Sequence, residues 1–233
     1  MGEKASEVAG NLARVREGIE RAAARRGAQP GSIRLVAVTK GVAVARIEQA
    51  LAAGVEDLGE NYLQEALPKV GALGRRARWH FIGHLQTNKV RAALPLFELM
   101  QSVDSARLAQ EISRRAGPLG LVGRVLVEVN TSGEPSKYGV PPPGVGELLA
   151  ACAGLEHLEV LGLMTIGRLG ADEAGTRACF RTLAGLFARY QQAPGVQMRW
   201  LSMGMSHDYE LAIEEGANMI RVGTAIFGPR PSR

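Results

Sequence analysis

An eightfold rhythm of short apolar segment, polar or glycine-rich turn and helical segment constrains this chain of 233 residues most strongly. The apolar segments occupy residues 35–40, 55–58, 78–82, 99–103, 124–129, 158–164, 197–203 and 218–222. Strands that alternate with helices favour a parallel sheet with crossover helices, and eight such strands close a barrel. We therefore predict an α/β fold with one domain over residues 1–233, a (β/α)8 TIM-like barrel preceded by an additional amphipathic helix over residues 3–26.

An open, doubly wound sheet is the alternative fold for such a pattern. No Gly-x-Gly-x-x-Gly string follows the first predicted strand, so nothing supports a dinucleotide-binding fold. The chain length also suits one α/β barrel. The barrel is therefore the favoured fold.

Charge and cysteine content exclude several classes of function. The net charge of +5 comes with isolated arginine pairs and no basic tract, so nucleic acid is not an expected partner. Cys152 and Cys179 form no ligand cluster, so no metal site is expected, and two cysteines suggest a reducing compartment. No apolar run reaches membrane-spanning length and no signal peptide is visible, so we expect a soluble cytoplasmic protein.

Lys40 is the first candidate functional residue. It ends the apolar run that begins at Leu35, so it stands at the rim of a core. A desolvated lysine can act as an amine nucleophile towards a carbonyl, which arginine cannot do. The alternative is a lysine that only extends its ammonium to solvent at a strand end.

The loops after the seventh and eighth predicted strands resemble a phosphate cradle. Barrels often bind phosphate there, and the loops hold Gly204, Ser206, Gly223 and Thr224, with Arg221 just before them. Glycine permits close approach of backbone N–H groups to an anion, although these glycines could also simply turn the chain. A nucleophilic lysine opposite a phosphate site suggests a phosphorylated aldehyde: pyridoxal 5′-phosphate (PLP), or a phosphorylated sugar in a lysine-dependent aldolase.

Several longer strings carry a family resemblance over nearly the whole chain. They are Ala37-Val38-Thr39-Lys40, Gly59-Glu60-Asn61-Tyr62, Trp79-His80-Phe81-Ile82-Gly83-His84-Leu85-Gln86, Leu163-Met164, Ser202-Met203-Gly204-Met205-Ser206 and Arg221-Val222-Gly223-Thr224-Ala225-Ile226-Phe227-Gly228. In this order they resemble the pyridoxal phosphate homeostasis protein family. The resemblance implies a barrel related to the N-terminal domain of alanine racemase, with PLP held as a Schiff base on Lys40. Thr39 and Gly41 flank this lysine where serine before it, and threonine or asparagine after it, look more usual.

The resemblance also assigns roles to single residues. It implies that Ser206, Gly223 and Thr224 hold the phosphate. Asn61 and His80 would stand at strand ends near the pyridine ring, and Met203 would pack on that ring. Arg221 would serve either the phosphate or the pyridine nitrogen. Lys137, in a loop of residues 131–144 rich in proline and glycine, resembles a family lysine at a mobile position and is a candidate for transient cofactor contact; the alternative is a solvated loop lysine.

Two functions follow from the resemblance. One is a non-enzymatic protein of vitamin B6 homeostasis, a monomer or weak homodimer that buffers PLP or delivers it to apo PLP-dependent enzymes. The other is a PLP-dependent racemase-like enzyme. Such a racemase is expected to have a second domain that supplies a tyrosine base, and only residues 229–233 follow Gly228, so we expect no such domain and favour the homeostasis function.

Overall fold

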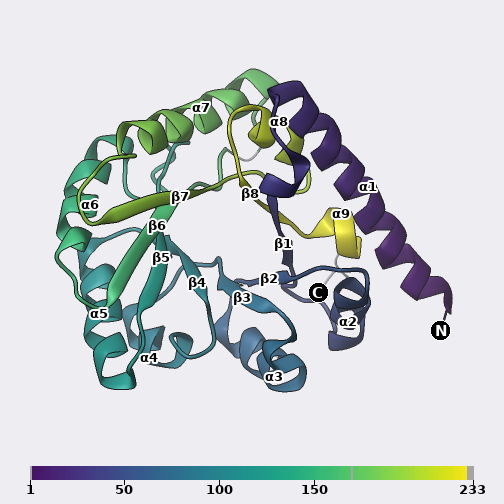
Figure 1. The fold of residues 1–233 in the computed structure, drawn as a ribbon, viewed down its shortest axis with the longest axis horizontal. Helices are drawn as coiled ribbons and strands as arrows, with labels where there is room; N and C mark the ends of the chain where they lie inside the picture. The colour runs from purple at the N-terminus through teal and green to yellow at the C-terminus, as the bar shows by residue number, and fades with distance from the viewer. Residues whose placement is uncertain (1, 169, 230–233) are drawn as a thin grey trace.

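The eight strands form a closed parallel barrel in chain order in a computed structural model that describes residues 2–168 and 170–229. The barrel and its surrounding helices are seen in Figure 1. The strands are β1 (Arg34–Val38), β2 (Asp57–Glu60), β3 (Arg78–Phe81), β4 (Leu99–Val103), β5 (Gly123–Glu128), β6 (Leu158–Met164), β7 (Val196–Ser202) and β8 (Met219–Val222). This confirms the predicted (β/α)8 barrel and its additional N-terminal helix.

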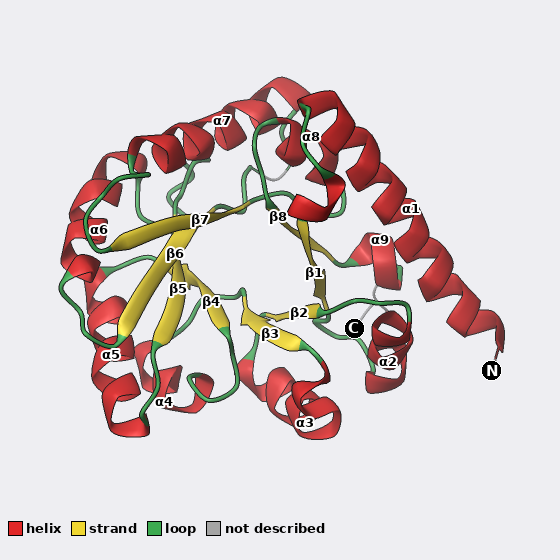
Figure 2. Ribbon diagram, viewed as in Figure 1, coloured by secondary structure: helices red, strands yellow, loops and turns green. Residues whose placement is uncertain are grey.

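Helices surround the barrel on its outside, as Figure 2 shows. They are α1 (Gly2–Arg26), α2 (Val44–Ala52), α3 (Leu63–Leu73), α4 (Val90–Ala93), α5 (Ala106–Ala116), α6 (Val145–Ala153), α7 (Glu173–Arg189), α8 (Tyr209–Glu214) and α9 (Thr224–Phe227). Short 3-10 turns occupy Pro30–Ser32, Gly74–Arg76, Thr87–Lys89, Gly117–Leu119 and Pro142–Gly144. Among the described residues, none of these helices combines the length and the apolar character that a membrane crossing requires.

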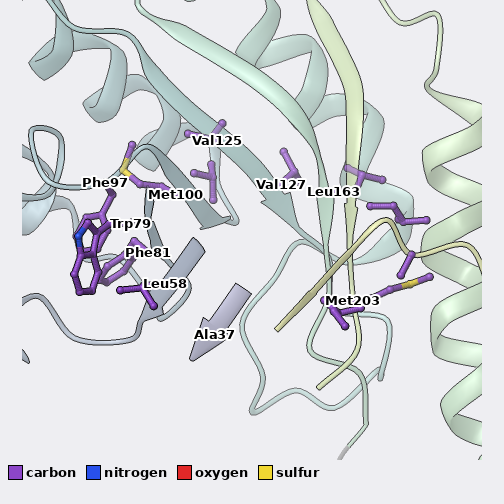
Figure 3. Close-up of a cluster of buried hydrophobic side chains, with 14 of the residues drawn as sticks. Ala37, Leu58, Trp79, Phe81, Phe97, Met100, Val125, Val127, Leu163 and Met203 are labelled. Atoms are coloured by element: carbon purple, nitrogen blue, oxygen red, sulfur yellow. The ribbon is translucent and has the colours of Figure 1, made fainter. Parts of the chain in front are cut away.

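The main hydrophobic core lies between the strands and the helices. Successive strand residues face opposite sides, so every second side chain packs outwards against a helix. Figure 3 shows part of this layer, including Leu58, Phe81, Met100, Val125, Val127 and Leu163 from strands β2 to β6. Phe81 meets Phe97 edge to face with ring centroids 5.1 Å apart. This outer layer fixes the strands, and therefore the positions of the strand ends.

The barrel interior is partly apolar and partly polar. A second, smaller hydrophobic cluster fills it; its members are Val36, Leu99, Leu126, Leu161, Met164 and Met219. Buried polar side chains lie on strands β2, β3, β4, β5, β7 and β8; they are Asp57, His80, Gln101, Glu128, Ser202 and Arg221. Since a buried polar group is costly unless it has a hydrogen-bond partner, these side chains are the part of the core that most needs an explanation.

Helix α1 packs along α8 and α9 outside the barrel, as Figure 1 shows. Its apolar stripe, which includes Leu12 and Val15, is buried. Gly18 permits close contact, because a Cβ there would lie 2.0 Å from the hydroxyl of Tyr209. Arg25 adds ion pairs to Glu210 and Glu214 on α8. The helix thereby supports the chain segment between β7 and β8.

Residues 131–144, between β5 and α6, fold back onto the end of β5. Val129 and Val140 form a parallel bridge, and the Val140 N–H donates to the Glu128 carbonyl at 2.8 Å. The Asn130 amide donates to the Glu134 carbonyl at 2.9 Å. The predicted long loop is therefore confirmed, and it is anchored at the carboxyl ends of the strands.

Candidate functional site

Lys40 lies at the carboxyl-terminal mouth of the barrel, two residues after β1 ends. It has the same strand parity as Val36 and Val38, which places it on the inward-facing side. Its side chain is half-buried, and Nζ lies 3.3 Å from the Tyr62 hydroxyl and 4.7 Å from the centre of that ring. The amine is therefore accessible to a ligand, and the orientation of β1 directs it towards the mouth of the barrel.

A buried ion pair supports the backbone on which Lys40 stands. Thr39 is fully buried, and its hydroxyl donates to Glu60 Oε1 at 2.5 Å. Lys69 Nζ donates to the same oxygen at 2.6 Å and to the Thr39 carbonyl at 2.7 Å. On the far side of Lys40, the Gly41 N–H donates to Glu65 at 2.8 Å. Both neighbours of Lys40 are thus held, and Lys69 is committed to structural acceptors.

The loops after β7 and β8 meet beside β1, because the barrel closes by pairing β8 with β1. A Cβ on Gly223 would lie 3.3 Å from Val38 Cβ, so glycine lets this turn approach the strand that carries Lys40. The N–H groups of Gly223 and Ala225 both donate to Ser206 Oγ, at 3.1 and 3.2 Å. Two backbone donors therefore converge on one point next to the lysine strand.

Arg221 lies deeper in the barrel than these loops. It pairs in register with Val36, whereas Gly223 packs on Val38, one inward-facing position higher. Its Nη1 donates to Ser202 Oγ at 2.6 Å and its Nη2 to the Thr165 carbonyl at 2.7 Å. Burial lowers the pKa of the guanidinium to about 10, against the attraction of nearby carboxylates, so Arg221 stays charged at neutral pH.

His80 is not at a strand end, where we expected it. It lies inside β3 (Arg78–Phe81), and its exposed fraction is 1%. Its Nε2 lies 2.9 Å from Asp57 Oδ1 at the start of β2, and its Nδ1 lies 2.9 Å from the Gln101 amide. Phe81, Ile82 and Gly83 follow it before the chain reaches the mouth, and its partner Asp57 begins β2, so the side chain faces the barrel interior below the mouth.

The other predicted residues occupy different depths. Asn61 follows β2 at the mouth and is half-buried, and Thr224 is exposed at the first position of α9. Met203 follows β7 and is fully buried in the main core, where Figure 3 labels it. Lys137 donates to the Gly167 carbonyl at 2.7 Å and pairs with Glu134 at 3.5 Å. The structure therefore gathers Lys40, Asn61 and the Ser206 loop at the mouth, while Lys137 stands on the opposite side, against the chain after β6.

Glu128 is a site residue that sequence reasoning missed. Glu128 is the last residue of β5, and its exposed fraction is 4%. Together with Lys137 and Thr165 it borders a cavity of 160 Å³. Burial raises the pKa of its carboxyl to about 7, helped by repulsion from Asp104 and opposed by the charge of Arg221. A carboxyl group directly after the apolar run Val125-Leu126-Val127, at the end of β5, is the sequence signal that could have identified it.

No grouping of three or more histidine, cysteine or carboxylate side chains suited to a metal ion occurs within residues 2–168 and 170–229. Cys152 and Cys179 are free and buried. Burial raises the pKa of the Cys152 thiol to about 11. The chemistry of the mouth therefore depends on an amine, a guanidinium, hydroxyl groups and backbone N–H donors.

Comparison with known proteins identifies the family. The profile described as "Alanine racemase, N-terminal domain" matches residues 11–231. The pyridoxal phosphate homeostasis protein of Aquifex aeolicus is 42% identical over 220 residues, which cover 94% of this chain and 96% of that protein. The chain belongs to the pyridoxal phosphate homeostasis protein family.

Solved structures agree with this membership in the pyridoxal phosphate homeostasis protein family. The structure of PipY from Synechococcus elongatus with PLP bound matches with a TM-score of 0.80 and 40% identity, covering 91% of this chain and all of PipY (100%). Alanine racemase from Clostridium difficile matches with a TM-score of 0.76 and 19% identity, and the match covers 97% of this chain and 57% of the racemase. The second likeness shows the shared barrel fold.

Proposed function

We propose that this protein binds PLP as part of vitamin B6 homeostasis, with the Lys40 amine as the covalent anchor. The observation that carries the proposal is the adjacency of Lys40 to a point where two backbone N–H groups converge, across the closure of β1 with β8. The Lys40 amine is a nucleophile, and the backbone N–H groups are hydrogen-bond donors for an anion. PipY, at 40% identity, was solved with PLP bound, which supports the same ligand here.

The residues at the mouth fit the chemistry of PLP. When bound, PLP supplies an aldehyde that condenses with an amine and a phosphate that needs hydrogen-bond donors. Ser206, Gly223 and Thr224 provide hydroxyl and backbone donors for the phosphate. Lys40 provides the amine, because the neighbouring Lys69 is buried and paired with Glu60, and Lys137 stands on the opposite side of the mouth.

The depth of Arg221 favours the ring nitrogen over the phosphate as its target. It lies one inward-facing position below the Gly223 turn, and two of its N–H groups are already directed towards β6 and β7. A guanidinium that stays charged offers donors and no acceptor. We propose that its remaining N–H groups face the ring nitrogen and keep it unprotonated, while Asn61 contacts the ring from the end of β2. Met203, which the resemblance assigns to the ring, is instead fully buried in the main core, where it supports the end of β7.

We also propose that the protein holds or delivers PLP to apo enzymes and does not turn over amino acids. The name of the Aquifex relative supports a homeostasis role. Exposed Tyr62 and Tyr138 beside the mouth offer apolar contact to a partner. The expected cytoplasmic location and monomeric or weakly dimeric state stay predictions.

Borohydride trapping tests the anchor. The purified protein is loaded with PLP, reduced and digested, and the modified peptide is found by mass spectrometry. We expect the pyridoxyl group on Lys40, its loss in Lys40→Ala and its full retention in the matched variant Lys137→Ala. Modification of Lys69 or Lys137 in the wild-type protein, or unchanged labelling of Lys40→Ala, would overturn the assignment.

Transfer kinetics test delivery. PLP-loaded protein is mixed with increasing amounts of an apo PLP-dependent enzyme, and reactivation of that enzyme is followed. Direct delivery makes the transfer rate rise with acceptor concentration, whereas release into solvent makes the rate independent of it. A rate that stays at the spontaneous release rate at every acceptor concentration argues for buffering alone.

A further inference from the structure

A continuous chain of hydrogen bonds crosses the barrel interior from Arg221 to the amino-terminal face. Arg221 Nη1 lies 2.6 Å from Ser202 Oγ, which lies 2.6 Å from Gln101 Oε1. Gln101 Nε2 lies 2.9 Å from His80 Nδ1, and His80 Nε2 lies 2.9 Å from Asp57 Oδ1. All five residues are at most 4% exposed. The chain occupies strands β8, β7, β4, β3 and β2, so it spans the width of the barrel.

Donor and acceptor chemistry gives this chain one direction. A guanidinium has no acceptor, so Arg221 donates a hydrogen bond to Ser202 Oγ. The Ser202 hydroxyl must then donate its own hydrogen bond to Gln101 Oε1. The amide NH₂ of Gln101 then faces His80, whose Nδ1 must accept. His80 is therefore the tautomer with hydrogen on Nε2, which donates to Asp57.

The far end of the chain is a fixed anion. Burial alone would raise the pKa of the Asp57 carboxyl, but hydrogen bonds from Arg78 and His80 hold it well below its usual range. Arg78 donates to both oxygens of Asp57 at 2.9 Å, and Arg34 adds an ion pair at 3.7 Å. The last acceptor of the chain is thus charged and immobile at neutral pH.

Gln101 is the one amide in this network, and its orientation places its acceptor oxygen towards Ser202 and its donor nitrogen towards His80. Its second amide hydrogen points at Met219 Sδ, 3.3 Å away. If the amide were reversed, Ser202 would face two donors and lose its own acceptor. A half-satisfied buried network is less favourable than an apolar core, so a chain with every link satisfied holds each member in one orientation.

We propose that Gln101 and His80 are positioning residues for the cofactor, because they lock Ser202 and thereby aim the remaining N–H groups of Arg221 at the ring nitrogen of PLP. This inference rests on the proposed function. Neither residue touches the mouth. Their effect is transmitted over three hydrogen bonds from His80, and over two from Gln101, to the guanidinium.

A pair of ligands separates positioning from general stability. PLP and its 1-deaza analogue, in which the ring nitrogen is replaced by carbon, are titrated into wild-type protein and variants. We expect Gln101→Met to weaken PLP binding by about tenfold, the worth of one charge-assisted hydrogen bond, while the affinity for the analogue changes little. Gln101→Glu should restore part of the preference, since one carboxylate oxygen still accepts from Ser202.

Ser102→Ala is the matched control, because Ser102 is the buried neighbour of Gln101 on β4 and its hydroxyl donates to the Gly83 carbonyl, outside the network from Arg221 to Asp57. Its loss should leave the ratio of the two affinities unchanged. If Gln101→Met weakens both ligands equally, the positioning role is overturned, while trapping on Lys40 would leave the proposed function intact. If wild-type protein binds neither ligand, both proposals are wrong.

Nitrogen NMR of the cofactor-free protein tests the direction of the chain without any ligand. With ¹⁵N-labelled histidine, His80 should show hydrogen on Nε2 and an accepting Nδ1, and its signal is assigned by its loss in His80→Gln. In Gln101→Glu the new carboxylate accepts from Nδ1, so that nitrogen should become protonated. A wild-type His80 with hydrogen on Nδ1, or an Nδ1 signal that is unchanged in both Gln101 variants, would overturn the inferred chain.

Discussion

The Lys69 ammonium donates to the carbonyl oxygen of Thr39, the residue immediately before Lys40, at 2.7 Å. The same ammonium pairs with the fully buried Glu60 at 2.6 Å. One lysine therefore holds the backbone on which another lysine is presented. The arrangement explains why two lysines in the same region have different roles: the buried one is fixed by its acceptors and the half-buried one faces the mouth.

Removal of Lys69 should destabilise the protein strongly. Lys69→Met leaves the Glu60 charge buried without its partner, and such a loss costs about 3–5 kcal/mol of unfolding free energy. The double variant with Glu60→Gln should recover much of this loss. Urea unfolding measures the free energy of the wild type, Lys69→Met and the double variant. Arg114→Met, which breaks an exposed pair with Glu111, is the control and should cost only about 0–1 kcal/mol. Equal effects of the two single variants would contradict the buried-pair account.

Glu128 should make stability depend on pH. Its pKa in the folded protein, about 7, lies above the ordinary value of 4.5, so the folded state binds its proton more tightly than the unfolded state. The group therefore lowers stability as pH rises from about 4.5 to 7, and the full penalty of about 3 kcal/mol applies above that range. Glu128→Gln removes the penalty.

Unfolding free energies of wild type and Glu128→Gln, measured by urea at pH 5 and pH 8, check this expectation. The variant should gain more relative to wild type at pH 8 than at pH 5. Stability differences that are the same at both pH values would show that Glu128 is not held as a protonated acid near neutrality.

Much of this arrangement follows from sequence because barrel closure is a strong constraint. Once eight alternating strands close a barrel, β1 and β8 become neighbours. Lys40 and Gly223, which follow these strands, must then lie at the same mouth of the barrel. The apolar runs also located the strands well; β4 (Leu99–Val103) and β6 (Leu158–Met164) have the predicted bounds.

The barrel interior could not be predicted in the same way. The resemblance implies a strand-end position for His80, whereas the apolar run that predicts the strand already continues past it to Ile82, and β3 places it before Phe81. Register irregularities between β4 and β5, and between β5 and β6, further separate sequence spacing from depth in the barrel. The role of Lys69 was missed because the pattern of its helix does not show that its ammonium contacts the Thr39 carbonyl, directly after β1. These residues depend on contacts between distant strands and helices, which local patterns do not contain.

The phosphate should account for a large share of PLP affinity. Ser206 Oγ is the point on which the Gly223 and Ala225 N–H groups converge, so Ser206→Ala removes a hydroxyl donor and disturbs both backbone donors. We expect PLP binding to weaken by about fivefold, the worth of about 1 kcal/mol. Binding of unphosphorylated pyridoxal should be much weaker and should not respond to the substitution.

Equilibrium titration of both aldehydes against wild type and Ser206→Ala measures this dependence. Ser136→Ala, in the exposed loop of residues 131–144, is the control and should change neither affinity. Comparable affinities for PLP and pyridoxal in the wild-type protein would contradict a phosphate cradle at this loop.

Arg221 also argues against rapid turnover of amino acids. Removal of an α-proton needs a base with a suitable pKa and a ring that withdraws electrons, and a protonated ring nitrogen strengthens that withdrawal. The guanidinium of Arg221, with a pKa of about 10, stays charged and can only donate, so it cannot support a protonated nitrogen at the position we propose.

We therefore expect PLP-loaded protein to exchange the α-proton of amino acids in deuterated water far more slowly than ordinary enzymes turn over, which is roughly 1–1000 per second. Proton NMR of single amino acids follows the exchange, with Lys40→Ala as the blank. Exchange at enzymatic rates that disappears in Lys40→Ala would show that the protein is an enzyme, and exchange that increases in Arg221→Glu would show that the guanidinium is what holds the reaction back.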